Sequence, residues 1–516
     1  MSVRSIRSEN RFDLTIVGSG LSCCYTLLAL LEELKSRCVA RTVSIAVIEK
    51  DAMFWTGVSC GTRSSFNSLM ITNLDDFLPL EDKDGFFSWL NKLNWKEIIA
   101  EGGDLAARWF ERNCNLIERQ KWGSIFLPRQ LFGDYTRAKV VDAIATARAN
   151  GIARVSQIAG EAIQTRRCDA SWELTISAST GAHTLTSYAV VLAVGNPQYS
   201  SLEPFIDGQA FSATIVDHPY EPSITCSLSR INKGLSTAPA GKRNILVVGS
   251  NATALEVIYH LASNSAVALD QLVIISRGGT LPEHLGKSDA CDPYPEHLAA
   301  TRHKADLQAR DIMDALLKDL EAFRERGRSG LSHIVHLVPE LTKLLPDAEQ
   351  VVFQNRWGGA FTKLIRRAGH EYLDVPQRLL AEGKLSICKG ELVHLKPTCE
   401  AFACAQYVGS NEQVFTHPTP FPVVVNCRGF EEPSIRSNSK IIRDLISKGL
   451  CTVNDSGRGF RVNEQLEASE RFYVVGPLLA GAYTSRLRGW HFETARRIRP
   501  AATLLAHHLG QTLLVS

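Results

Sequence analysis

The sequence predicts an α/β fold with two doubly wound, Rossmann-like nucleotide-binding domains, the first of them discontinuous, and a helical insert. Residues 12–24 and residues 244–261 carry this prediction, because each stretch reads as a buried strand, a glycine turn and a helix. A third observation is a late apolar strand that ends at Gly476 and is followed by a C-terminal helix. A strand and helix at this place are expected where the end of the chain comes back to complete the first domain.

The first stretch contains the parts of a dinucleotide site in the required order. Gly18 permits the tight turn after the strand, and Gly20 lets the backbone approach a pyrophosphate at the helix N-terminus. The next strand-like run ends in Glu49, which is placed to accept the ribose hydroxyl groups. Cys23 departs from the pattern, because it stands where Gly or Ala usually allows close packing of helix on strand.

Composition describes an ordinary globular chain. With 516 residues, 45% of them hydrophobic and 22% charged, the chain can bury the cores of two or more domains. A net charge of +3 gives no case for nucleic acid or a membrane as a partner. The N-terminus lacks an apolar secretory core, so we expect a cytoplasmic protein. The thirteen cysteines include no Cys-x-x-Cys pair, which favours free thiols and argues against a metal site.

Two segments after Glu49 offer polar side chains to a bound cofactor. Residues 51–79 are loop-rich and can cover a flavin ring, with Asn73 offering an amide to its polar edge. A surface loop with an aromatic plug explains this segment equally well. Arg129 follows a proline at the start of a helix, where it can reach a cofactor phosphate, an anionic substrate or a structural salt-bridge partner. A later apolar strand ends at Gly195 and suits the strand that returns to the dinucleotide.

The second stretch is a variant of the same fingerprint. Gly249 occupies the turn, and Thr253 lies in the first turn of the following helix. Asn251 replaces the middle glycine, although Asn tolerates left-handed backbone angles better than most residues. The next strand ends at Arg277 rather than at an acid, and an Arg there can pair with a 2′-phosphate, so NADPH is favoured over NADH. A solvated charge at the strand end is the alternative.

The rest of the chain adds a helical insert and a closing segment. Residues 294–345 are strongly charged with helical spacing, which predicts a helical cap or insert in the second domain. After Gly476 comes a helix that begins near Glu493. Its positive N-terminal end would favour a reduced, anionic flavin beside it, although a plain terminal helix fits the same pattern.

Several of these motifs together resemble a known family. They are Gly18-x-Gly20, Pro128-Arg129-x-x-x-Gly133-x-Tyr135, Gly195-Asn196, Gly249 with Thr253 and Ala254, Ser276-Arg277-Gly278 and Trp490-His491-x-Glu493. The chain resembles the bacterial FAD/NAD(P)-binding flavoproteins, in particular the branch that contains amino-group N-monooxygenases such as aspartate N-monooxygenases. The resemblance implies an FAD-binding domain over residues 1–225, an NADPH-binding domain over 240–405 and a return to the FAD domain over 406–516.

The resemblance also implies an activity. NADPH would reduce FAD, and the reduced flavin would react with molecular oxygen to give a hydroperoxyflavin that hydroxylates a small amine or amino acid. The sequence identifies no catalytic side chain. A substrate carboxylate could be received by arginines and a histidine near the C-terminal helix, namely Arg486, Arg488, His491 and Arg496. The same side chains suit phosphate contacts or surface charge equally well.

Two other functions compete with this interpretation. A dithiol oxidoreductase needs a redox cysteine pair soon after the ribose-binding acid, where the sequence offers only Cys60. A flavin- and NADPH-binding oxidoreductase or redox sensor without oxygen insertion would carry the same fingerprints.

Overall fold

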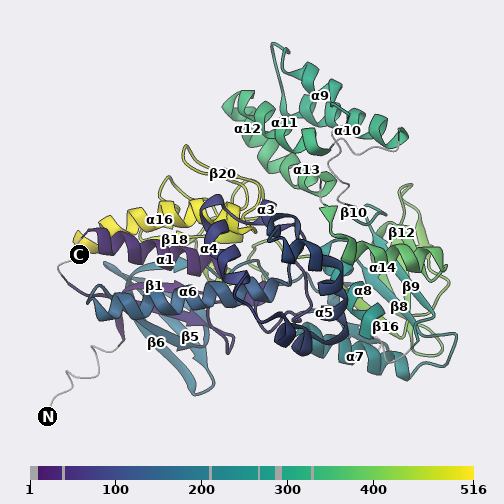
Figure 1. Cartoon of the computed structure of the whole chain (residues 1–516), viewed down its shortest axis with the longest axis horizontal. Helices are drawn as coiled ribbons and strands as arrows, with labels where there is room; N and C mark the ends of the chain where they lie inside the picture. The colour runs from purple at the N-terminus through teal and green to yellow at the C-terminus, as the bar shows by residue number, and fades with distance from the viewer. Residues whose placement is uncertain are drawn as a thin grey trace.

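The computed structural model describes residues 10–37, 41–207, 212–264, 268–284, 293–326, 331–365 and 367–515. A mixed sheet and a parallel sheet, each with helices packed on it, form two neighbouring halves of the molecule, and a helical lobe stands out from them (Figure 1). This architecture confirms the predicted α/β class with two doubly wound domains and a helical insert. Within the described ranges, no helix is both long and apolar enough for a membrane span.

The first sheet draws strands from both ends of the chain. Its main order is β17-β18-β6-β1-β2-β3, and β4 and β5 form an antiparallel meander that joins β6. The strands are β1 (Arg11–Val17), β2 (Val43–Glu49), β3 (Ala153–Ala159), β4 (Glu161–Cys168), β5 (Ser171–Ala178), β6 (Gly181–Leu192), β17 (Glu467–Ser469) and β18 (Phe472–Val474). Because β18 pairs in parallel with β6, the C-terminal segment completes the first domain, as predicted.

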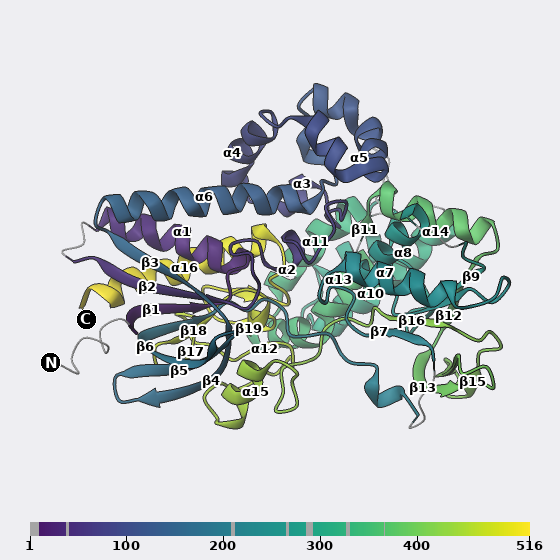
Figure 2. The same ribbon diagram turned by 90° about the horizontal axis from the view of Figure 1, so that it is seen from below.

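Three long helices lie along the first sheet (Figure 2). They are α1 (Leu21–Ser36), α6 (Arg129–Ala149) and α16 (Ala495–Val515), and α1 packs against both of the others. The apolar side of α1 is fully buried at Leu27, Leu30 and Leu34. The inner residues of β1 and β2 are buried as well, which is the pattern of parallel strands covered on both faces.

The second sheet is parallel throughout, in the order β12-β9-β8-β16-β7. Its strands are β7 (Thr214–Val216), β8 (Asn244–Val248), β9 (Gln271–Ser276), β12 (Leu385–Lys389) and β16 (Val423–Asn426), and its helices are α7 (Ile224–Ser236), α8 (Ala252–Asn264) and α14 (His370–Ala381). An antiparallel sheet of β13 (Glu391–Pro397), β14 (Ala403–Val408) and β15 (Val414–Thr416) packs beside it.

The strands of this sheet extend beyond the domain boundaries that were predicted at residues 225 and 405. β7 lies before the first boundary and β16 lies after the second, yet both belong to the second sheet. The reason is non-local, because β16 is inserted between β8 and β7 and all four of its residues are buried there. A short apolar run of this kind does not reveal which sheet it joins.

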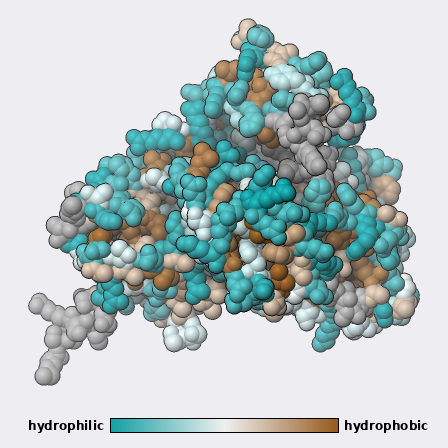
Figure 3. All heavy atoms as spheres, viewed as in Figure 1, coloured by the Kyte–Doolittle hydropathy of each residue, from teal (hydrophilic) through white to brown (hydrophobic). Residues whose placement is uncertain are grey.

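The helical lobe extends further than the predicted residues 294–345. Its helices are α9 (Glu296–Thr301), α10 (Ala309–Glu325), α11 (Leu331–Leu344), α12 (Asp347–Val352), the π-helix η3 (Phe353–Trp357) and α13 (Gly358–Ile365). The lobe has its own apolar core, which includes Leu316, Val338 and Phe353. The face of the molecule seen in Figure 3 is mainly hydrophilic, with hydrophobic residues scattered in small groups.

A segment of the first domain packs against helices of the second domain and so connects the two halves. It contains α2 (Gly57–Cys60), α3 (Leu74–Phe77), α4 (Leu80–Leu90), α5 (Trp95–Glu118) and η1 (Trp122–Ser124). Side chains of this segment share one apolar cluster with Tyr259 of α8 and Tyr372 of α14. The Tyr372 hydroxyl accepts a hydrogen bond from the Leu69 amide at 2.7 Å and donates one to the Leu69 carbonyl at 3.1 Å. The two sheets are therefore held at a defined separation.

The remaining elements are short. They are η2 (Glu203–Phe205), β10 (Glu283–His284), β11 (Arg367–Ala368), α15 (Lys440–Ser447), η4 (Gly476–Leu479), β19 (Ala482–Tyr483) and β20 (Arg488–Gly489).

The first glycine turn gives a test of the fold. Gly18 has φ +95°, and a Cβ atom there would lie 2.5 Å from the Ala193 carbonyl oxygen. We expect Gly18→Ala to lower the free energy of unfolding by clearly more than the ~1–2 kcal/mol of left-handed strain alone, because the backbone just after β6 must also move. Urea unfolding followed by circular dichroism measures this loss.

Gly151→Ala is the matched control. Gly151 also has a positive φ, +67°, but an added Cβ would meet no atom within 4 Å. This variant should lose only about 1–2 kcal/mol. Equal losses in the two variants would show that the close approach at Gly18 does not matter.

Candidate functional site

A cavity of about 420 Å³ lies where the carboxyl ends of the strands in the first sheet meet α8 of the second domain. The first domain contributes Gly18, Gly20, Glu49, Gly57, Arg63, Arg129, Gly195 and Tyr199, among others, and the second contributes Ala252, Thr253 and Glu256. In doubly wound folds, ligands bind at this end of the strands. The cavity thus touches both predicted nucleotide fingerprints.

In the first fingerprint, backbone segments pack closely around the start of α1. The Gly18 amide donates to the Ile48 carbonyl at 2.8 Å, so the turn is tied to the neighbouring strand. Gly20 directly precedes α1, a helix of 16 residues. Gly57 lies opposite it, and a Cβ atom added to Gly57 would be 3.0 Å from the Gly20 Cα atom. The N-terminal end of α1 therefore borders the cavity with little side-chain cover, which is the arrangement of an anion site.

Glu49 organises the turn from the side. Its carboxylate accepts hydrogen bonds from the Ser19 amide and hydroxyl, both at 2.8 Å, and from the Asp51 amide at 3.0 Å. The Ser19 hydroxyl oxygen also accepts a bond from the amide of Trp55, which is buried and has φ +74°. Cys23 is fully buried, so it fills the third fingerprint position without disturbing the turn.

The second fingerprint lies across the cavity. Gly249 has φ +103°, and a Cβ there would lie 2.2 Å from the Cys427 carbonyl oxygen, so this turn also requires glycine. Thr253 lines the cavity, and its hydroxyl is 3.3 Å from the Tyr199 hydroxyl. Arg277 is exposed at the end of β9, outside the cavity lining.

Arg129 forms a salt bridge across the domain boundary, which is one of the three alternatives that its sequence position allows. Arg129 Nη1 lies 2.8 Å from Glu256 Oε2, and Nη2 donates to Glu256 Oε1 at 2.9 Å. Glu256 is only 2% exposed and belongs to α8, whereas Arg129 is the first residue of α6. Burial opposes the charge of Arg129, but Glu256 holds the pKa of the guanidinium well above its usual value.

Further polar groups complete the surroundings of Glu256. Tyr220 donates to Oε2 at 2.9 Å, and Ser68 donates to Oε1 at 2.6 Å. The Ser68 hydroxyl also lies 3.1 Å from Nε2 of His260, one turn further along α8. His260 is 1% exposed, its Nδ1 has no hydrogen-bond partner among the described residues, and burial lowers the pKa of the ring to about 4.

Glu256 and His260 were not predicted as site residues. The available signal was their spacing, because two ionisable residues four positions apart lie on one face of a largely apolar helix. Nothing in the local sequence indicated that Arg129 and Ser68 would meet them, since both come from the other domain.

The other predicted residues take different positions. Asn73 Oδ1 accepts a hydrogen bond from the Asp76 amide at 2.9 Å and caps α3, and Asn73 does not line the cavity. Gly195 lines the cavity at the end of β6 with φ +78°. Gly476 also has φ +78°, and a Cβ there would lie 2.1 Å from the Ser22 hydroxyl oxygen. The absence of a side chain at Gly476 thus lets the C-terminal segment approach α1.

The cysteines do not provide a reactive dithiol at this site. Cys23, Cys24 and Cys60 are buried, and burial raises the pKa of each thiol. Thiols of this kind are poor nucleophiles. The dithiol oxidoreductase alternative therefore receives no support here.

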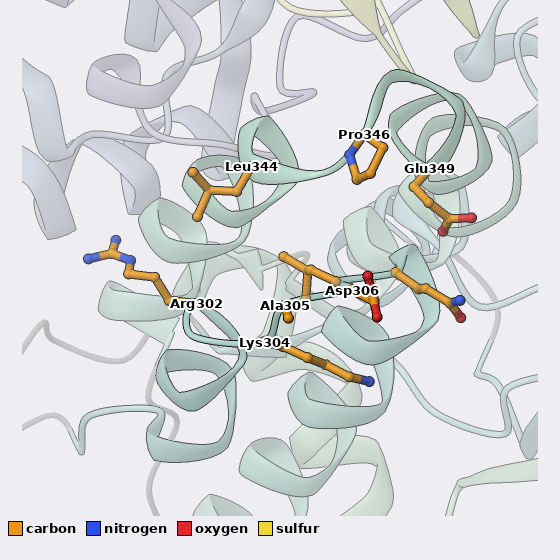
Figure 4. A pocket seen from close by; sticks show the side chains of 9 residues that line it. Arg302, Lys304, Ala305, Asp306, Leu344, Pro346 and Glu349 are labelled. Atoms are coloured by element: carbon orange, nitrogen blue, oxygen red, sulfur yellow. The ribbon is translucent and has the colours of Figure 1, made fainter.

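A second hollow, of about 380 Å³, lies within the helical lobe (Figure 4). Several of its charged groups are already engaged, because Lys304 pairs with Asp311 at 2.6 Å and Arg302 pairs with Glu340 at 2.9 Å. The Glu349 carboxylate accepts the Ala309 amide at 2.7 Å.

Comparison with known proteins identifies relatives of the whole chain. Residues 15–197 match a family model described as FAD-NAD(P)-binding. The uncharacterized protein Rv3403c of Mycobacterium tuberculosis is 34% identical over 520 residues, covering 97% of this chain and 96% of the relative. The match over residues 15–197 confirms the expected FAD/NAD(P)-binding region.

Solved structures share the architecture at low sequence identity. The reduced form of ornithine hydroxylase (PvdA) from Pseudomonas aeruginosa has a TM-score of 0.58 and 14% identity, covering 97% of this chain and 99% of that one. The cadaverine monooxygenase DfoA from Erwinia amylovora, bound to FAD, has a TM-score of 0.51 and 14% identity, covering 98% and 93%. These likenesses confirm the fold that the motifs predicted.

The interdomain ion pair gives a second prediction. Arg129→Met would leave the Glu256 carboxylate buried without its cation, and we expect the free energy of unfolding to fall by about 3–5 kcal/mol. Urea unfolding measures the change. The exposed pair Arg302–Glu340 supplies the control, because Arg302→Met should hardly shift the transition. Similar transitions for both variants would contradict a structural role for the buried pair.

The buried histidine predicts a pH dependence of stability. Because the pKa of His260 in the folded protein, about 4, lies below its ordinary value of 6.5, the unfolded chain takes up the proton first as the pH falls. The stability that the neutral ring contributes is complete above pH 6.5 and is lost as the pH falls towards 4. Between pH 7 and pH 5 the loss amounts to roughly 2 kcal/mol.

His260→Gln isolates this contribution, because glutamine keeps a polar group at the site and does not titrate. Urea unfolding of both proteins at pH 7 and pH 5 gives the difference. The wild type should lose about 2 kcal/mol more than the variant over this interval. Parallel losses would mean that His260 is protonated in the folded protein or reaches solvent.

Proposed function

Because this chain belongs to the same family as the mycobacterial protein Rv3403c and contains an FAD-NAD(P)-binding region, we propose that it is an FAD-dependent, NADPH-consuming monooxygenase. Its substrates would be molecular oxygen and a small amine or amino acid. The observation that carries this proposal is that residues of both nucleotide fingerprints line the same cavity. A reaction that passes electrons from one nucleotide to the other needs both at one site.

The first fingerprint suits the adenosine diphosphate part of FAD. The amides at the N-terminus of α1 would hold the pyrophosphate beside Gly18 and Gly20, and Glu49 would accept the ribose hydroxyl groups. Glu49 and Ser19 already hold the turn in this shape, so little reorganisation is needed on binding. When bound, FAD supplies the activation of oxygen, and the protein supplies orientation and electrostatics.

The second fingerprint suits NADPH. The turn at Gly249 and the start of α8 at Thr253 would receive the pyrophosphate, and Arg277 would pair with the 2′-phosphate. The exposure of Arg277 supports this role, because the guanidinium is open to an incoming ligand.

Residues between the two fingerprints would fix the distance between the two bound nucleotides. Arg129 and Glu256 tie α6 to α8 beside the cavity, with Tyr220 donating to the same carboxylate. Both oxygens of Glu256 are occupied, so its role is to position the two domains rather than to move a proton. Asn73 as a contact to the flavin and the cytoplasm as the location stay predictions from the sequence.

A spectroscopic experiment tests the proposed function. Purified protein reconstituted with FAD should lose its flavin absorbance when NADPH is added without oxygen, and regain it in air. Addition of a substrate amine in air should yield a hydroxylated product, detected by mass spectrometry. Reduction without any hydroxylated product across amine and amino-acid substrates would favour the redox sensor. A protein that cannot bind FAD would overturn the proposal.

Arg277→Ala refines this test. Loss of the charge that pairs with the 2′-phosphate should raise the KM for NADPH about tenfold or more and leave the KM for NADH unchanged. The control is Arg310→Ala, which removes an exposed arginine of the helical lobe that pairs with Asp314. An equal effect of Arg277→Ala on both coenzymes would place the 2′-phosphate elsewhere.

A further inference from the structure

Two arginines flank the glycine turn of the second fingerprint. The turn follows β8, and the sheet order places β9 on one side of β8 and β16 on the other (Figure 1). Ile275 of β9 and Asn426 of β16 both lie opposite Val248, the last residue of β8. Arg277 and Arg428 follow these partners by two residues, so they stand at one level on either side of the turn. Because neighbouring strands are about 4.8 Å apart, the ends of β9 and β16 are roughly 10 Å apart.

This edge of the second sheet contains a switch in the order of its strands. From β8 the chain adds β9 and β12 on one side, and only then adds β16 on the other side. Open α/β sheets bind ligands in the crevice at such a switch, outside the carboxyl ends of the strands. A Cβ atom added to Gly249 would lie 2.9 Å from the Arg428 amide nitrogen, and Phe430 lines the main cavity. The segment that carries Arg428 therefore touches both the second fingerprint and the cavity.

The two side chains are directed to the same face of the sheet. Because side chains alternate along a strand, Arg277 is directed to the face of Ile275, and Arg428 to the face of Val424. Ile275 and Val424 belong to the apolar cluster shared with β13 and β14, whereas α8 covers the other face. The Arg428 guanidinium carbon lies 4.3 Å from the centre of the Phe205 ring, which packs against that same cluster.

The positive charge at this edge is poorly compensated. Among the described residues, neither Arg277 nor Arg428 forms an ion pair with a carboxylate. Burial lowers the pKa of Arg428, and the charge of Arg277 lowers it further, although Glu391 opposes the shift. The Asp217 carboxylate is already engaged, because it accepts hydrogen bonds from three other groups. Two cations on the same face repel each other, so the arrangement costs stability unless an anion binds between them.

Space is left beside both arginines. Gly429 follows Arg428 with φ +102°, and a Cβ atom there would meet no atom of the described residues within 4 Å. Gly278 follows Arg277, and the nearest described atom to a Cβ there would be the Thr280 hydroxyl oxygen at 3.8 Å. Arg277 itself is exposed. A phosphate group can therefore approach the two arginines without breaking an ion pair among the described residues.

We propose that Arg428 binds the 2′-phosphate of NADPH together with Arg277, so that the coenzyme preference depends on a residue at the end of β16. The inference rests on the proposed NADPH site and adds a specificity-determining residue from outside both fingerprints. Guanidinium groups suit this role, because they bind phosphate through paired, charge-assisted hydrogen bonds. The Phe205 ring holds the Arg428 guanidinium in place by a cation–π contact. The bound phosphate would also relieve the repulsion between the two arginines.

Two adenosine nucleotides that differ by one phosphate test the assignment. FAD-loaded protein is titrated by calorimetry with adenosine 2′,5′-bisphosphate and with AMP, which lacks the 2′-phosphate. Arg428→Met should weaken the binding of the bisphosphate by about 10- to 100-fold and change that of AMP by less than about twofold. The same comparison with NADP⁺ and NAD⁺ should show a loss for NADP⁺ only.

A double variant shows whether both arginines serve one phosphate. Arg277→Ala combined with Arg428→Met should bind NADP⁺ no more tightly than NAD⁺, because no guanidinium is left for the 2′-phosphate. A double variant that still prefers NADP⁺ would show that another group binds this phosphate, and the assignment would be wrong.

Controls separate this role from a general effect on the fold. Arg378→Met removes an exposed arginine of α14 that pairs with Glu382, and it should bind all four ligands like the wild type. Arg428→Lys keeps the charge without the paired donors, and its preference for the bisphosphate should fall between those of the wild type and Arg428→Met. FAD content should match the wild type in every variant. If Arg428→Met does not fold, an unchanged preference in Arg428→Lys overturns the assignment.

The remaining outcomes also decide the question. Equal losses for the bisphosphate and AMP would place Arg428 at a part of the nucleotide that both share. That result, unchanged binding in Arg428→Met, or a wild type that binds the bisphosphate no better than AMP would each overturn the assignment. Failure of the proposed function has a different signature. In that case NADPH does not reduce the bound flavin, whatever the four titrations show.

Discussion

The buried ion pair between Arg129 and Glu256 sets the relation between the two nucleotide-binding domains. Taking two charges out of water is costly, and the attraction between them offsets this only when the remaining hydrogen bonds are also made. Here they are made, because Tyr220, Ser68 and Ser64 complete the surroundings of the pair. Such a pair specifies one arrangement of its partners more than it adds stability, since any shift of α6 against α8 breaks several bonds together.

The cavity depends on this arrangement, because its walls belong to different domains. The first glycine turn and Glu49 lie on one side, and the start of α8 lies on the other. The apolar cluster that contains Tyr259 and Tyr372 supports the joint from the side of the inserted helices. The relative position of two bound nucleotides would therefore be set by contacts between the protein's own side chains.

The sequence allowed prediction of what is local. Gly18 and Glu49 could be assigned because a strand, a tight turn, a helix and a second strand follow one another within forty residues. The partner of Arg129 could not be predicted, because Glu256 lies 127 positions away and the two meet only when the domains pack. The domain limits failed for a similar reason, since β16 joins its sheet between strands from distant parts of the chain. Asn73 caps α3, as Asn commonly does at the start of a helix, and its contact to the flavin stays a prediction from the sequence.

The acceptors around Arg129 explain why this arginine is not open to a ligand. Arg129 has a full set of acceptors, so a phosphate or carboxylate arriving there would have to displace Glu256 and leave that acid buried and unpaired. The Arg129 motif, which the sequence made most conspicuous, is therefore structural.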